Sequence, residues 1–365
     1  MAGLVPSGPS GMRDYGDMLA VELQRLNIAT GELWIENDGT HLRAAMGAGF
    51  RLLRRALTLH HPTAVVWHYS PFAYAYRGIP LVGVLFGLVL RARGIPVVTV
   101  LHELFYPWGH RGLVGTTYAL TQRVALRAVL AGSTSVIVTT EQRAAAVRRR
   151  RWGPPRASVD VVPVFSTIGE GMRRPAAEPQ VLRLGVIGYG SDGAQVDLFF
   201  DALRQIPGHR TLRVVLLGAP GPASVQGRRW MRLAEVAGVG DQIEFTGVVS
   251  APSLGAHFVA CAVVVLLDKE GPTSRRTMLA AALAHGCPTV ATDGPNRWDD
   301  PVDKGAVLLV PPCATALGQV LQRLLEHAPE RDGIGVRAAR YYQEELSLQK
   351  AGQSIAVAIA AARGL

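Results

Sequence analysis

The sequence predicts an α/β protein built from two doubly wound domains, each a parallel sheet covered by helices, facing one another across a cleft. The chain has 365 residues, more than the roughly 250–300 residues at which a single core stops growing. Short β-rich runs alternate with longer helical patterns in both halves, as right-handed βαβ units require. A stretch rich in glycine, proline and charge, 169–180, separates the halves and is typical of a linker.

The first half, 1–168, contains five apolar runs that predict strands, and helical patterns fill the intervals. Helices are expected over 15–26, 118–130 and 141–150. The most apolar run, 79–90, is shorter than the 18 or so residues that a membrane span needs, and it predicts a buried helix. The strands are expected over 4–5, 64–68, 97–101, 135–138 and 159–162.

The second half, 181–345, repeats the alternation. A helix over 196–206 would place five apolar side chains on one face, and a later helix should end near Gly286, a natural glycine at a helix C-terminus. Because ligands of doubly wound sheets bind beyond the carboxyl ends of the strands, the loops there should carry the chemistry. The strands are expected over 182–187, 212–217, 243–245, 262–267, 289–291 and 306–309.

Arginine dominates the charge of the chain. Lysine and arginine together number 38, only three of them lysines, against 28 acidic residues, so the net charge is +10. A basic surface favours anionic partners such as phosphates, nucleic acid or an acidic membrane face. At the densest run, 148–151, a solvated helix end is favoured over membrane contact and nucleic-acid binding. The N-terminus shows no secretory signal, so we expect a cytosolic protein.

The three cysteines indicate neither a disulfide framework nor a metal site. Cys261, Cys287 and Cys313 are an odd number and lack any C-x-x-C spacing. We therefore expect three buried free thiols.

Two glycine-containing loops precede helices, as phosphate-binding loops do. In "VLRLGVIGYGSDG", 181–193, a strand leads into three glycines spaced G-x-G-x-x-G, and in "VPSGPSGMRDYGDML" Gly8 and Gly11 come just before a helix. Glycines there let a phosphate approach the backbone. An NAD site also needs an acidic residue after the next strand, but "LRVVLLGAP" ends without one. The spacing favours a nucleoside diphosphate over NAD, with an ordinary turn as the alternative.

The most informative loop is "DKEGPTSRRTMLAAALAHGCPTVATDG", 268–294, which joins a strand to a helix of small residues. Arg275 and Arg276 stand where this helix begins, although cations are unfavourable at the positive end of the helix dipole. Functional sites often break such local rules. The two arginines are therefore expected to meet an anion, and surface arginines without a ligand are the alternative.

This loop and helix resemble the donor-side signature of the family 4 glycosyltransferases of the GT-B fold. Six further segments are similar to that family in order and spacing, and they cover most of the chain. The resemblance implies two Rossmann-like domains, with the acceptor on 1–168 and a nucleotide-sugar donor on 181–345, and a C-terminal helix, 346–365, that packs back on the first domain. The segments are "PSGPSGMRDYGDMLAVEL", "VVTVLHELFYP", "SVIVTTEQ", "LGVIGYGSDG", "VVLLGAP" and "IEFTGVV".

The resemblance implies sugar transfer with retention of anomeric configuration, without a metal or another cofactor. Many relatives carry two glutamates separated by seven residues, E-x7-E, where this chain has Thr273 and Ala281. The sequence resembles instead a branch with an acidic-Gly-x-Ser/Thr-x-Arg-Arg loop, 270–276. Asp268 and Glu270 also form D-x-E, the metal-binding pattern of GT-A glycosyltransferases, but that single-sheet fold would leave the second domain unexplained.

The motifs and the resemblance together assign the site. Charge on a departing nucleoside diphosphate needs stabilisation. Clustered aromatic residues on two loops of the first domain suit stacking on an acceptor, although core packing explains some of them. The expected catalytic residues are Glu270, Arg275, Arg276 and His102, which resembles the family histidine that contacts the donor sugar and could instead be structural. The expected donor contacts are Gly8, Gly11, Gly188, Gly190, Ser191, Val248, Thr273 and Ser274, and the expected acceptor contacts are Arg13, Asp14, Tyr69, Phe72, Glu103, Tyr106 and Trp108.

The acceptor stays open among a natural product, a cell-envelope lipid precursor and a polysaccharide, so peripheral contact with the inner face of the membrane fits as well. No nucleic-acid partner is expected. Two other functions are compatible with the fold: another GT-B enzyme, such as a sugar epimerase or phosphorylase, and a non-catalytic nucleotide-sugar-binding partner protein.

Overall fold

The computed structural model describes residues 1–7, 10–59, 62–149, 157–171, 181–188, 194–219 and 221–364. The chain forms two compact units, Met1–Pro163 with Leu348–Leu365, and Val164–Ser347. The first unit thus ends before the predicted boundary at 168. The reason is that Val164 N donates to Ser274 O, 3.0 Å away, and so begins the second unit.

The first unit contains a six-stranded parallel sheet in the order β2-β1-β3-β6-β7-β8. The five expected strands are confirmed. β2 was not predicted, because its four residues are half-buried or exposed at the sheet edge and no buried apolar run marks them. The strands are β1 (Ala2–Val5), β2 (Leu33–Glu36), β3 (Val65–Tyr69), β6 (Val97–Leu101), β7 (Ser135–Val138) and β8 (Ser158–Val161).

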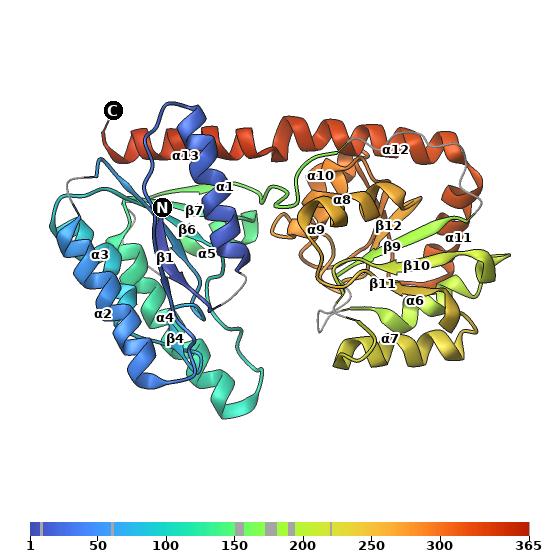
Figure 1. Cartoon of the computed structure of the whole chain (residues 1–365), viewed down its shortest axis with the longest axis horizontal. Helices are drawn as coiled ribbons and strands as arrows, with labels where there is room; N and C mark the ends of the chain where they lie inside the picture. Colours follow the sequence, from blue (N-terminus) through green and yellow to red (C-terminus); the bar gives the residue numbers. More distant parts are fainter. Residues whose placement is uncertain are drawn as a thin grey trace. The chain divides into compact units, whose positions relative to one another are not determined.

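Helices cover both faces of this sheet. The chain reverses direction across the sheet after β2, so right-handed crossovers place α1 on one face and α2 to α5 on the other. On the face of α1, the last helix α13 packs against α1, β6 and β7, and Figure 1 shows α13 in red beside α1 in blue. The helices are α1 (Gly11–Arg25), α2 (Leu42–Thr58), α3 (Phe86–Ala92), α4 (Gly112–Gly132), α5 (Glu141–Arg148) and α13 (Leu348–Ala362).

The apolar run 79–90 differs from its prediction. Its first residues form strand β5 (Ile79–Pro80), which pairs with β4 (Ala75–Tyr76), and a 3₁₀ turn η1 (Val82–Leu85) precedes α3. Pro80 disfavours helical geometry at the residue before it, so the helix begins later than the apolar pattern suggests.

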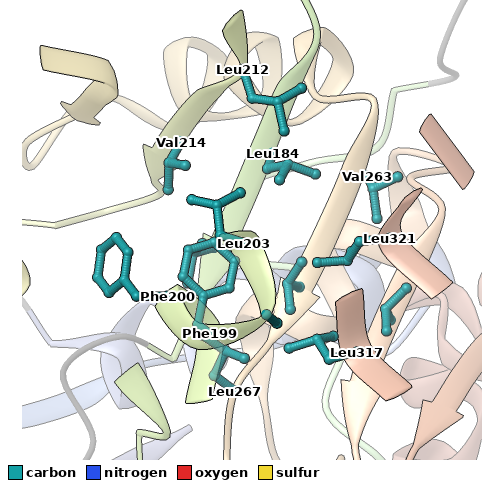
Figure 2. Packing of buried hydrophobic residues seen from close by; sticks show 14 of the residues in the cluster. Leu184, Phe199, Phe200, Leu203, Leu212, Val214, Val263, Leu267, Leu317 and Leu321 are labelled. Atoms are coloured by element: carbon teal, nitrogen blue, oxygen red, sulfur yellow. The ribbon is translucent and has the colours of Figure 1, made fainter. Parts of the chain in front are cut away.

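The second unit holds a second parallel sheet, in the order β11-β10-β9-β12-β13-β14. All six expected strands are confirmed. Figure 2 shows its core, where Phe199, Phe200 and Leu203 of α6 lie in one cluster with Leu184 and Val214 of the sheet and with Leu317 and Leu321 of α11. The strands are β9 (Arg183–Ile187), β10 (Arg213–Leu216), β11 (Ile243–Phe245), β12 (Val263–Leu266), β13 (Thr289–Thr292) and β14 (Val307–Val310).

Seven α-helices lie among the described residues of the second unit. α6 ends at Leu203, earlier than the predicted 206, and a π turn, η4 (Tyr342–Leu346), follows α12. Within the described ranges, no helix has the length and apolar content of a membrane span. The α-helices are α6 (Val196–Leu203), α7 (Val225–Val236), α8 (Ala251–Ala260), α9 (Thr277–Ala284), α10 (Asp299–Asp303), α11 (Ala314–Glu326) and α12 (Ala328–Tyr341), with 3₁₀ turns η2 (His209–Thr211) and η3 (Gly240–Gln242).

The cysteine prediction needs one correction. All three thiols are free, and Cys261 and Cys287 are buried, but Cys313 is exposed. It stands immediately before α11 rather than within a buried strand. Backbone N–H groups of the first turn of α11 lower the pKa of the Cys313 thiol.

Candidate functional site

The loop between β12 and α9 packs closely on the loop that follows β13. A Cβ added to Gly294 would lie 2.3 Å from the carbonyl carbon of Glu270 and 2.4 Å from the nitrogen of Gly271. Asn296 N donates to Glu270 O at 2.9 Å, and Gly271 has a φ of +82°, which favours glycine. The two loops therefore form one compact edge beyond the carboxyl ends of neighbouring strands.

Asp268 anchors this edge. It follows β12, is only 1% exposed, and forms an ion pair with Arg276. Its Oδ1 accepts the N–H of Glu270 at 2.9 Å, so both carboxylate oxygens already have protein partners. Burial lowers the pKa of the Arg276 guanidinium, which nevertheless stays charged. Much of the positive charge of Arg276 is thus neutralised by Asp268 inside the protein.

Arg275 differs from its neighbour. It is exposed two residues before α9, and no ion-pair partner for it occurs in the part of the chain that the structure describes. Thr273 and Ser274 are buried beside it, and the Thr273 hydroxyl has no hydrogen-bond partner within the same described ranges. Of the two arginines, Arg275 is therefore the one available to an anion at the N-terminus of α9.

Glu270 is held by a residue that the sequence did not single out. Its Oε2 accepts a hydrogen bond from Nδ2 of Asn296, and the side chain is half-buried. The only sequence signal that could have identified Asn296 is its polar side chain, which stands shortly after the "TDG" turn. This contact fixes the Glu270 carboxylate at the edge where a donor is expected.

The glycine loop after β9 is described only at its start. Gly188 has a φ of +76°, and a Cβ there would lie 3.1 Å from Cδ1 of Leu266, so glycine suits both the conformation and the space. The predicted contacts Gly190 and Ser191 lie outside the described residues. Val248 is exposed in the segment after β11.

The candidate residues around α1 are partly described. Gly8 lies outside the described residues. Gly11 opens α1, and a Cβ there would meet no atom within 4 Å, so packing does not require glycine. Arg13 and Asp14 are both exposed on the first turns of α1, with Arg13 Nε 3.6 Å from the Asp17 carboxylate.

His102 lies in the first unit after β6 and pairs with a second histidine. Its Nε2 is 3.0 Å from Nδ1 of His68, and the rings stack with centroids 5.3 Å apart. The buried ring of Tyr15 meets both edge-on. His68 is fully buried at the carboxyl end of β3, and its Nε2 has no partner within the described ranges. His68 was not predicted from the sequence, because it lies inside an apolar strand.

The histidine pair predicts a pH dependence of stability. Burial and the nearby Arg143 lower the pKa of His102 from 6.5 to about 4. Between these values the unfolded chain binds a proton that the folded chain does not, so stability falls as the pH drops. We expect a loss of about 2 kcal/mol from His102 alone between roughly pH 7 and pH 5, measured by urea unfolding. His68 contributes with the same sign. An unchanged pH slope in His102→Gln would contradict this assignment.

The candidate aromatic residues divide between core and surface. Tyr69 is fully buried in the core of the first unit, which places it out of reach of an acceptor and corrects its expected role. Phe72 and Tyr106 meet edge-to-face at 6.2 Å. Phe72 and Trp108 are exposed, and Tyr106 is half-buried. The surface members form one group near the carboxyl end of the sheet.

Two charged residues border this aromatic group. The exposed Glu103 accepts a hydrogen bond from the Ser70 hydroxyl at 3.1 Å. The guanidinium of Arg123 lies over the ring of Trp108, 4.5 Å from its centroid. The group can therefore offer rings for stacking and a carboxylate as a hydrogen-bond acceptor.

A cavity of about 510 Å³ lies elsewhere in the second unit, between the C-terminal end of α9 and α12. Ala284, Gly286 and Val336 line it together with Glu170 and Arg340. The candidate donor loop is at the opposite, N-terminal end of α9. This cavity is therefore distinct from the predicted site.

Comparison with known proteins identifies the class. Residues 4–164 match the family model described as "Glycosyl transferase 4-like domain", and residues 178–327 match that described as "Glycosyl transferases group 1". The chain is a glycosyltransferase. It belongs to the family 4 glycosyltransferases, and its two parallel-sheet units are those of the GT-B fold. A comparison with curated proteins found no match.

Solved structures share the fold over nearly the whole chain. Sucrose-phosphate synthase from Thermosynechococcus elongatus is 16% identical, with a TM-score of 0.70 over 98% of this chain and 97% of that one. Anabaena HepE in complex with UDP and glucose is 14% identical, with a TM-score of 0.70 over 99% and 100%. WaaG, a glycosyltransferase involved in lipopolysaccharide biosynthesis, is 15% identical, with a TM-score of 0.68 over 98% of each chain.

Proposed function

We propose that the enzyme transfers a sugar from a nucleoside-diphosphate donor to an acceptor hydroxyl or amine, with retention of configuration and without a metal. The observation that carries this proposal is the edge formed by 268–276, where Arg275 is exposed before α9 and Glu270 is fixed by Asn296. The HepE structures contain UDP with glucose and UDP-glucose, which supports a donor of that class.

In the proposed step, the bond between the anomeric carbon and the diphosphate oxygen breaks on the face where the acceptor oxygen or nitrogen bonds. The acceptor's proton passes to the departing diphosphate, so no enzyme nucleophile is required. Arg275 and the N–H groups at the start of α9 stabilise the charge that develops on the diphosphate. Glu270 accepts a hydrogen bond from a donor-sugar hydroxyl, and the predicted sugar contact of His102 belongs to the same proposal.

The first unit supplies the acceptor surface in this proposal. Phe72, Tyr106 and Trp108 stack on the acceptor, and Glu103 binds one of its polar groups. A natural product or a cell-envelope precursor, met in the cytosol or at the inner face of the membrane, fits such a surface.

Acceptor-dependent release of nucleoside diphosphate tests the function. The protein is incubated with a panel of nucleotide sugars, with and without sugar, phenolic and lipid-linked acceptors. Release that requires an acceptor supports transfer, and NMR of the product's anomeric signal tests retention. Interconversion of the nucleotide sugars would indicate an epimerase, and binding without chemistry would contradict the proposal. Activity that disappears on chelation by EDTA would contradict the metal-independent step.

Arg275→Ala is expected to lower kcat by about 10²–10³-fold, the usual effect of removing one preorganised donor to a developing charge. Because Arg275 is exposed, the free energy of unfolding should change by less than about 0.5 kcal/mol. Arg232→Ala, an exposed arginine of α7, is the matched control and should retain wild-type turnover. Equal turnover in the two variants would remove Arg275 from the site.

A further inference from the structure

One long stretch of the first unit is almost free of acidic residues. Between 39 and 140 the chain has ten arginines, and only Glu103 among its 28 acidic residues. Helices α2, α3 and α4 come from this stretch, and none of them contains aspartate or glutamate. α3 packs on both α2 and α4, and Figure 1 shows the three side by side. Together they form a layer of one charge sign.

Two arginines hold this layer together. Arg91 Nη1 donates to the carbonyls of Ala131 and Ser133 at the end of α4, each 3.2 Å away. Arg93 donates to the carbonyl of Ala56 at the end of α2. These contacts satisfy helix C-termini, so both arginines have a structural purpose. The arginines of α2 itself are different, because they are exposed and their helix offers no acidic partner: Arg43, Arg51, Arg54 and Arg55.

The same layer exposes apolar side chains at helical spacing. On α2, Leu42, Phe50 and Leu57 are 50%, 56% and 60% exposed. They are eight and seven residues apart, about two helical turns each, and so share one side of the helix. On α4, Leu113 is 87% exposed, and Leu120 and Val124 are exposed after it. Single exposed leucines are ordinary, but a repeated row marks an interaction surface.

The buried sides of these helices face the sheet. Ala48 and Leu52 of α2 belong to the same buried cluster as Leu126 and Val129 of α4 and the strand residues of the first unit. The exposed rows are therefore not displaced core positions. We define the basic-apolar surface by Leu42, Phe50, Leu57, Leu113, Leu120 and Val124 with the four exposed arginines of α2.

We propose that the basic-apolar surface docks this enzyme on an anionic lipid bilayer. Aliphatic and aromatic side chains can enter the boundary between headgroups and acyl chains, while flanking arginines pair with lipid phosphates. Nucleic acid would use the arginines but gain little from the leucines. An acidic bilayer complements both components, and binding would require neither the donor nor sugar transfer.

Vesicle flotation of the full chain tests the proposal. Vesicles of phosphatidylcholine are compared with vesicles that contain about 30% phosphatidylglycerol, since anionic lipid attracts each nearby arginine by about 1 kcal/mol, or fivefold in affinity. The wild type should bind the anionic vesicles at least about tenfold more tightly than the neutral ones. The fourfold variant with Arg43, Arg51, Arg54 and Arg55 changed to Gln should lose about a hundredfold or more.

An apolar variant separates a bilayer from a purely ionic ligand. Phe50→Ser with Leu57→Ser should weaken vesicle binding about tenfold or more and leave binding to heparin, a soluble polyanion, unchanged. The matched control changes Val225 and Val236 of α7 to Ser and Arg228 and Arg232 to Gln, all exposed in the second unit, and should bind vesicles like the wild type. Absence of wild-type vesicle binding, or vesicle binding that survives Phe50→Ser with Leu57→Ser, would overturn the proposal. Thermal unfolding confirms that each variant is folded.

Discussion

Asp268→Ala is expected to lower the free energy of unfolding by about 3 kcal/mol and to abolish most sugar transfer. The carboxylate is 1% exposed and is the ion-pair partner of Arg276. Its removal leaves a partly buried guanidinium without a counter-ion, and breaking a buried pair typically costs about 3–5 kcal/mol. We use the lower end because the Arg276 side chain is 23% exposed. The amide of Glu270 also loses its acceptor, so the donor loop loosens. Urea unfolding and initial rates measure the two effects.

Two further variants define the origin of this loss. Asp268→Asn keeps an oxygen that can accept from the Glu270 amide but removes the negative charge. Relative to Asp268→Ala, it should therefore restore the geometry of the loop more fully than the free energy of unfolding. Asp268→Ala combined with Arg276→Met removes both partners, and it should be more stable than Asp268→Ala alone because no buried charge is left unpaired. If Arg276→Met lowers turnover tenfold or more without loss of stability, Arg276 acts on the donor rather than on Asp268. A single variant Asp268→Ala as stable as the wild type would refute the structural role of the pair.

Gly294→Ala is expected to lower kcat/KM by about a hundredfold, because displacements near 1 Å at a site can cost that much. The added Cβ would lie 2.3–2.4 Å from backbone atoms of Lys269, Glu270 and Gly271, and backbone cannot swing aside as a long side chain can. The loop that carries Glu270 and Arg275 must therefore shift. Overpacking of this kind also costs about 1–3 kcal/mol of stability. Steady-state kinetics and thermal unfolding measure the two effects.

Gly31→Ala is the matched control for this glycine. A Cβ at Gly31 would meet no atom within 4 Å, and its φ is not in the left-handed region. It should keep the wild-type kcat/KM and stability. Wild-type kinetics in Gly294→Ala would show that sugar transfer does not depend on the close packing of the loops that follow β12 and β13.

The doubly wound architecture could be predicted because buried parallel strands are nearly continuous apolar runs. Such runs mark β12 and β6 clearly. The edge strand β2 carries no such signal, since its side chains are at best half-buried. The run over 79–90 misled for a different reason: it is divided among a short strand, a 3₁₀ turn and a helix, and two of its apolar residues, Ile79 and Leu85, are exposed.

The site was predictable in position but less so in its contacts. The loop 268–276 could be located from its place after a strand and from its paired arginines. Sequence could not show that Arg276 is engaged by Asp268 while Arg275 is exposed, because that depends on the direction of each side chain at the start of α9. His68 and Asn296 were missed because they act through contacts with residues distant in sequence. Tyr69 was misassigned because its place among clustered aromatic residues suggested an acceptor contact, whereas every residue of β3 is buried.

The packing of α13 has a consequence for biosynthesis. This helix covers β6, β7 and α1 of the first unit, yet it is translated after the whole of the second unit, Val164–Ser347. The second unit can complete its core from one continuous segment as it leaves the ribosome. The first unit, although made earlier, must wait with β6 and β7 uncovered on the face of α1 until the final helix arrives. The nascent chain therefore completes its two units in the reverse order of their synthesis.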